Sequence, residues 1–171
     1  MAETSGVPGG AYVRQHEEVA ALVAEGVADR TGVQRGWDLV YQSRSGPPQV
    51  PWLEPDIGDH LQTVGAQGTR AVIVIPIGFV SDHMEVVWDL DTEAAERAEE
   101  LGILMVRAAT PGTDARFVSM IGALARERID GVPPGDRTRL GSLGAAPDAC
   151  LPGCCANPRG DLAAIGGATG S

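Results

Sequence analysis

The sequence predicts an α/β protein built on a parallel sheet, and three observations lead to that expectation. Segments with helical spacing alternate with short apolar segments along residues 12–129, the order that parallel strands joined by helices produce. Residues 71–77 (AVIVIPI) are continuously apolar, as in strands that helices cover on both faces. With 171 residues, 43% of them hydrophobic, the chain is long enough to bury a core.

Each element follows from a local pattern. Apolar residues recur at helical spacing from Tyr12 onward, and Gly32 is a plausible end for that helix. Gly102 ends another, and Asp114 caps the last. The expected helices cover residues 12–31, 56–66, 81–101 and 114–129, and the expected strands cover 37–42, 71–77 and 103–108. We predict an α/β domain over 1–130 and a flexible Gly/Pro-rich tail with a Cys cluster over 131–171.

Composition excludes several classes of protein. A formal net charge of −10 makes a nucleic-acid binder a poor hypothesis. The longest apolar run has ten residues and contains Pro76, too short for a transmembrane segment. The three cysteines, an odd number crowded into six residues, argue against a disulfide framework and favour a cytoplasmic protein.

Acidic residues gather where the apolar strand 71–77 gives way to a helix, at the edge of the sheet where α/β proteins bind ligands. Glu85, Asp89 and Glu93 follow one another at a spacing of four, which places them on one helical face, and Asp82 and His83 precede them. Such a row of oxygen ligands suits the binding of a divalent cation or acid–base catalysis. The same pattern is typical of a solvated acidic helix face.

A proline-rich loop is the second candidate region. Four prolines keep residues 43–55 irregular and hold Trp52 between them. The donors of residues 42–45 and an aromatic face would suit a flat, acidic, conjugated ligand, and Arg44 can pair with a carboxylate. The open alternative is that Trp52 only packs the loop onto the domain.

Four segments resemble ferrochelatase in order and spacing: GGAYVRQH, YQSRSGPPQVPWLEP, GFVSDHMEVVWDLD and VRAATPGTDARFV. These motifs are similar to those of the actinobacterial enzymes, which resemble coproporphyrin ferrochelatases. The resemblance implies a lyase of haem biosynthesis that inserts its substrate Fe²⁺ into coproporphyrin III, or protoporphyrin IX in other branches. It also implies two doubly wound parallel sheets flanked by helices. This chain maps to the second half, which lacks its first strand, so a further N-terminal half is expected.

The resemblance assigns roles to the acidic segment. Glu85 matches the catalytic glutamate of the family, and Asp82 and His83 match its supporting neighbours. Asp89 and Glu93 match carboxylates that, with Glu85, handle the metal, on a helix that is locally widened in the family.

The resemblance also assigns a porphyrin side, made of Tyr12, Ser43, Ser45 and Trp52. A His-Ser-Xaa-Pro segment, whose histidine faces the macrocycle in the family, has no counterpart in this sequence. A [2Fe–2S] cluster is implied at Cys150, Cys154 and Cys155, with a fourth ligand upstream, because such clusters take four cysteines.

Three functional hypotheses stand at this point. The first is a ferrochelatase fragment that alone is weakly active or inactive. The second is a non-catalytic remnant that binds metal or porphyrin. The third is a chelatase that inserts Co²⁺ into a corrin-type tetrapyrrole, against which the proline-rich loop and the cysteines speak.

Overall fold

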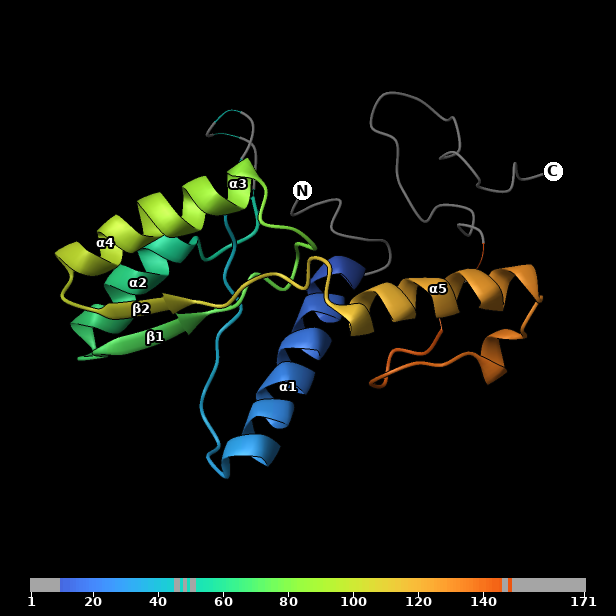
Figure 1. Ribbon diagram of the computed structural model, residues 1–171. Coiled ribbons are helices and arrows are strands. Elements are labelled where there is room, and N and C mark those ends of the chain that lie inside the picture. The colour runs from blue at the N-terminus through green and yellow to red at the C-terminus, as the bar shows by residue number, and fades with distance from the viewer. Residues whose placement is uncertain (1–9, 45–46, 48, 50–51, 146–147, 149–171) are drawn as a thin grey trace. The chain divides into compact units, whose positions relative to one another are not determined.

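The computed structural model describes residues 10–44, 47, 49, 52–145 and 148 (Figure 1). These residues divide into two compact units. Gly36–Phe117 is one unit, and the described parts of Met1–Arg35 and Val118–Ser171 are the other. The boundary expected at residue 130 stays a prediction, because most of residues 131–171 lie outside the described ranges.

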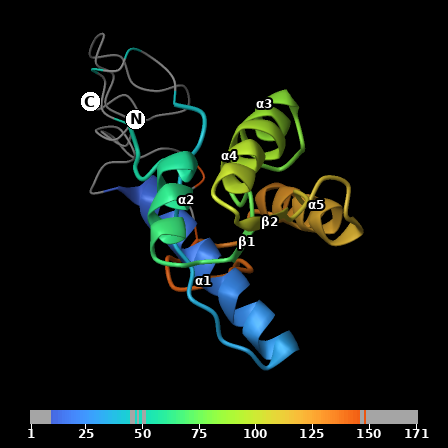
Figure 2. The same ribbon diagram turned by 90° about the vertical axis from the view of Figure 1, so that its left-hand side faces the viewer.

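The Gly36–Phe117 unit is built on a small parallel sheet. Strands β1 (Ala71–Val74) and β2 (Leu104–Arg107) pair in register from Ala71 opposite Leu104 to Val74 opposite Arg107. The connection between them is a long helix, which runs over the sheet in both views (Figures 1 and 2). The α/β class and the parallel sheet are therefore confirmed.

The predicted helices of this unit are confirmed with small changes at their ends. Helix α2 (Ile57–Ala66) begins after Asp56, whose carboxylate accepts a hydrogen bond from the Gly58 N–H at 2.8 Å. The long helix begins only at Met84, because His83 still has extended backbone angles, and ends before Gly102, whose φ is 68°. Its three parts are α3 (Met84–Val86), a π-helix (Val87–Ala94) and α4 (Ala95–Glu100).

The core of the unit lies between the long helix, α2 and the sheet. Leu61, Val86 and Leu90 are its largest fully buried side chains. Burying an aliphatic side chain of this size stabilises the fold by roughly 1.5–3 kcal/mol. The other buried members of the cluster are Ile57, Ala94, Ala98 and Ile103.

The sheet is buried on one face only. Val72 and Val74 pack against the core, whereas Ile73 on β1 and Leu104 on β2 are 67% and 66% exposed. The continuous apolar run predicted helices over both faces. The alternating burial corrects that detail.

The strand predicted over residues 37–42 is wrong. Tyr41 makes one isolated parallel bridge with Asp56: its N–H donates to the Pro55 carbonyl, and its carbonyl accepts from the Ile57 N–H, both at 2.9 Å. The next bond of the ladder would need an N–H at position 55, which proline lacks. On the other side α2 begins at once, so the bridge cannot grow into a strand.

The second unit consists mainly of helices. It contains α1 (Ala11–Thr31), nearly all of α5 (Ala115–Ile129) and a short 3₁₀ helix (Pro134–Asp136). Gly32 ends α1 with a φ of 70°, and Asp114 caps α5 by accepting from the Arg116 N–H at 2.9 Å, as predicted. Within the described ranges, no helix is long and apolar enough to cross a membrane.

Candidate functional site

A hollow of about 310 Å³ opens between the loop that follows Tyr41, the start of α2 and the π-helix. The loop contributes Gln42, Ser43 and Arg44, and the π-helix contributes Asp89 and Glu93. The remaining lining residues are Asp56, Ile57, Gly58 and Ala94. Three acidic residues, two of them on the π-helix, therefore line the same space as the polar residues of the loop.

The π-helix is what carries the two carboxylates. In a π-helix each N–H bonds to the carbonyl five residues back, which widens the turn, and such segments are frequent at functional sites. Its inner side is anchored by Leu90 and Ala94, which are buried in the core. Asp89 and Glu93, one position before each of them, lie at the edge of this buried side and border the hollow.

Asp89 is held by neutral donors. The Ser43 hydroxyl donates to Asp89 Oδ2, and the Gln42 amide lies 3.4 Å from the same oxygen and 3.3 Å from Ser43 Oγ. Ser43 adopts a φ of 61°, a left-handed conformation that costs an ordinary residue about 1–2 kcal/mol. The loop backbone is therefore strained at Ser43, the residue whose hydroxyl binds Asp89.

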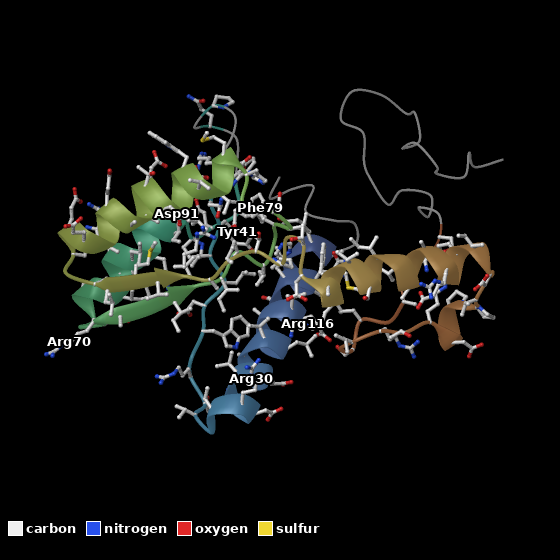
Figure 3. All side chains as sticks on the ribbon, viewed as in Figure 1. Arg30, Tyr41, Arg70, Phe79, Asp91 and Arg116 are labelled. Atoms are coloured by element: carbon white, nitrogen blue, oxygen red, sulfur yellow. The ribbon has the colours of Figure 1, made fainter. Side chains whose placement is uncertain are left out.

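The carboxylates of Asp82 and Asp91 are held by a cation instead. Arg107, at the end of β2, donates from Nη1 to Asp82 Oδ1 at 2.8 Å and from Nη2 to Asp91 Oδ2 at 2.8 Å, while its Nε binds Asp91 Oδ1. We call these three residues the Arg107 clamp. Asp91 projects from the π-helix (Figure 3). Hydrogen bonding to Asp91 raises the pKa of Arg107, and its partial desolvation opposes this only in part.

The start of the long helix carries the two remaining residues of the acidic segment. His83 is the residue before the first helical turn, and its ring meets that of Phe79 edge-on, with 5.1 Å between the ring centroids. Glu85 lies in that first turn and is exposed. A carboxylate there is favoured by the partial positive charge of the helix N-terminus.

The structure brings only part of the predicted site together. Ser43, Asp89 and Glu93 share the hollow, whereas Glu85 and the half-buried Trp52 do not line it. Tyr12 belongs to the other unit, where the centroid of its ring lies 4.1 Å from that of His16 and the two rings are tilted by 39°. Ser45 and the three cysteines, Cys150, Cys154 and Cys155, lie outside the described residues. Among the described side chains, no group of three or more His, Cys, Asp or Glu is arranged to hold a metal ion.

Sequence reasoning missed the role of Arg107. The signal was available, because Arg107 is the one charged residue in the apolar segment 103–108. A charge at the end of an apolar strand needs a partner. The two aspartates that serve as partners lie 25 and 16 residues away in sequence, so spacing along one helix could not reveal the contact.

Comparison with known proteins defines the class to which this fold and site belong. The family profile described as ferrochelatase matches residues 2–129. The chain therefore belongs to the ferrochelatase family, as the sequence motifs indicated.

The relatives that match most of the chain carry a more particular name. Coproporphyrin III ferrochelatase of Leifsonia xyli is 54% identical over 94% of this chain, and that of Streptomyces coelicolor is 56% identical over 86%. The protein of the same name from Mycolicibacterium smegmatis is 55% identical over 72% of the chain. These matches cover 41%, 40% and 35% of the relatives' own length, so the chain spans between about one third and two fifths of each.

Proposed function

We propose that this chain provides the metal-binding side of the active site in a ferrochelatase that inserts Fe²⁺ into coproporphyrin III. The observation that carries the proposal is the hollow in which Asp89 and Glu93 meet Ser43. Family membership supports the reaction, and the names of the relatives support coproporphyrin III over protoporphyrin IX.

Metal insertion requires that two pyrrole protons leave the macrocycle as Fe²⁺ enters. Glu85, exposed at the start of the helix, is the proposed proton acceptor by family resemblance, since a positioned carboxylate can take up protons. Asp89 and Glu93 provide hard oxygen atoms that replace water on Fe²⁺ before it reaches the porphyrin. The Ser43 hydroxyl holds one oxygen of Asp89 and leaves the other available.

The porphyrin side of the proposal rests on the loop and on α1. Trp52 offers an aromatic face, and the guanidinium of Arg44 at the hollow suits a propionate of the substrate. Tyr12, Ser43 and Ser45 complete this side by family resemblance. We propose that the protein acts in the cytoplasm. A [2Fe–2S] cluster on Cys150, Cys154 and Cys155 remains a proposal for the complete protein only.

A chimera tests the proposal directly. In the Leifsonia xyli relative, this chain replaces the aligned segment, and anaerobic conversion of coproporphyrin III with Fe²⁺ is followed by absorbance. We expect the chimera to turn over, and Glu85→Gln to lower its rate by about 10²–10⁴-fold. Glu99→Gln, an exposed change on α4, is the matched control and leaves the rate unchanged. An inactive chimera that folds and binds porphyrin would refute the proposal.

The chain on its own is expected to be far slower than the chimera, because it spans about two fifths of its relatives. That coverage favours a second candidate, a non-catalytic domain that binds porphyrin or metal. Titration of the chain with coproporphyrin III, beside its Trp52→Ala variant, separates the two. Binding that needs Trp52, together with an inactive chimera, would favour the second candidate.

A further inference from the structure

We propose that Arg107 is a positioning residue for metal insertion, because its guanidinium fixes the segment that carries His83 and Glu85 by binding one carboxylate before it and one after it. This inference rests on the ferrochelatase function proposed above. Arg107 itself does not need to touch Fe²⁺ or porphyrin.

The geometry of the clamp supports this role. Asp82 precedes Glu85 by three residues and Asp91 follows it by six, and both bind the same guanidinium. Two nitrogens bind Asp91 and one binds Asp82. A guanidinium is a rigid planar fork, so the loop before the helix and the middle of the π-helix are fixed relative to each other and to the end of β2.

The loops at the carboxyl edge of the sheet reinforce the clamp. The Gly112 N–H donates to the Val80 carbonyl at 2.9 Å, and the Thr110 N–H lies 3.4 Å from Asp82 Oδ1. Together with the Arg107–Asp82 ion pair, these bonds tie the loop after β2 to the loop that leads into the helix. The start of the helix therefore depends on contacts from β2 as well as on its own turns.

Partial burial makes the clamp stronger than an ordinary surface ion pair. The Arg107 side chain is 16% exposed, whereas the side chains of Asp82 and Asp91 are 37% and 35% exposed. Coulombic attraction increases as water is excluded from the charged groups. Asp82 Oδ1 also accepts hydrogen bonds from two donors, which makes Asp82 a group that holds the loop in place.

Hydrogen exchange on the intact chain, measured by mass spectrometry, tests the positioning. In Arg107→Gln we expect amides of residues 79–88 to exchange about tenfold faster, since the segment loses its hydrogen bonds to a charged group. Arg107→Lys recovers part of the protection. Arg97→Gln, which breaks an exposed ion pair with Glu100 on α4, leaves these amides unchanged. Asp82→Asn reproduces the local effect, and the double variant adds less than the sum of the two single changes.

The chimera connects positioning to chemistry. Arg107→Gln there should lower kcat by about 10–100-fold, as for other groups that orient metal-handling residues, while KM for coproporphyrin III stays unchanged. Unchanged exchange at residues 79–88, or an equal rise throughout the chain, would overturn the positioning role, as would an unchanged kcat. If the unmodified chimera is inactive, the proposed function fails, and exchange in the chain still decides whether Arg107 fixes this segment.

Discussion

The long helix over residues 84–100 and the loop before it present two pairs of carboxylates in different surroundings. Asp89 and Glu93 border the hollow, and Asp89 is held there by the neutral donors Ser43 and Gln42. Asp82 and Asp91 bind the guanidinium of Arg107. A carboxylate whose hydrogen-bond donors are neutral keeps its negative charge available for an incoming cation. The negative charge of a carboxylate bound to arginine is instead balanced within an ion pair that stabilises the fold. Residue type alone does not distinguish the two pairs.

The largest expected effect comes from a substitution in the core that supports the long helix. Leu90 is 2% exposed and lies between Asp89 and Asp91 in the sequence. Leu90→Ala should reduce the free energy of unfolding by about 2–5 kcal/mol through the cavity it leaves. Urea denaturation followed by circular dichroism measures this loss. Met84→Ala, at a side chain that is 78% exposed, is the control, and its effect should stay within about 0.5 kcal/mol. Equal effects of the two changes would contradict the assigned core.

The next change removes the cation from one pair. Arg107→Gln should lower the free energy of unfolding by about 1–2 kcal/mol, a range reduced for the partial exposure of both aspartates. Hydrogen bonding to Asp91 raises the folded-state pKa of Arg107 above the ordinary value of a guanidinium. Its contribution is therefore fully present below that ordinary value and is lost only as pH rises through the folded pKa. The difference between wild type and variant should stay constant from neutral pH to about pH 10, as urea titrations along that range would measure. A difference that shrinks steadily over this range would contradict the argument.

Matched substitutions in the two pairs sharpen the contrast. Asp91→Asn should cost about 1 kcal/mol of stability, because it weakens the bonds to Arg107. Asp89→Asn keeps an acceptor for the Ser43 hydroxyl and should change stability by less than about 0.5 kcal/mol, yet lower metal insertion by the chimera about tenfold. Thermal unfolding and the absorbance assay measure the two effects. If both variants behave alike in both assays, the division between the pairs is wrong.

The smallest expected effect concerns the strained residue of the hollow. Ser43→Ala removes the hydroxyl but keeps the left-handed backbone, whereas Ser43→Gly removes the hydroxyl and relieves the strain. Relief of about 1–2 kcal/mol of strain is partly offset by the roughly 0.5–1 kcal/mol of extra backbone entropy that glycine loses on folding, so the glycine variant should be more stable than the alanine variant by about 0.5–1 kcal/mol. Calorimetric unfolding of the two variants side by side tests this. An alanine variant at least as stable as the glycine variant would show that the positive φ carries no cost.

Local signals predicted the helices well. Asp56 and Asp114 cap the helices that follow them, and Gly32 and Gly102 end helices in the left-handed conformation. Each of these effects acts within a few residues and can be read from a short segment. The strand over 37–42 failed because a strand needs a partner, and the partner segment contains Pro55.

The candidate site was predictable to the extent that it lies on one helix. A spacing of four placed Asp89 and Glu93 together, and both border the hollow. The same spacing placed Glu85 with them, but Glu85 lies at the exposed start of the helix, before the stretch that meets residues 42–44. The Arg107 clamp depends on tertiary contacts between β2, a loop and the π-helix, which no periodicity encodes.

The π-helix also makes the length of this segment a structural requirement. Because its turns hold more residues than those of an α-helix, Val87–Ala94 resembles an α-helix into which an extra residue has been inserted. Deletion of a single residue there would return the segment to α-helical turns and keep the residues that follow in phase, so Ala98 would stay in the core. Asp89 and Glu93 would instead lose the widened turn that carries them beside the hollow. The length of this stretch is therefore a requirement of the site.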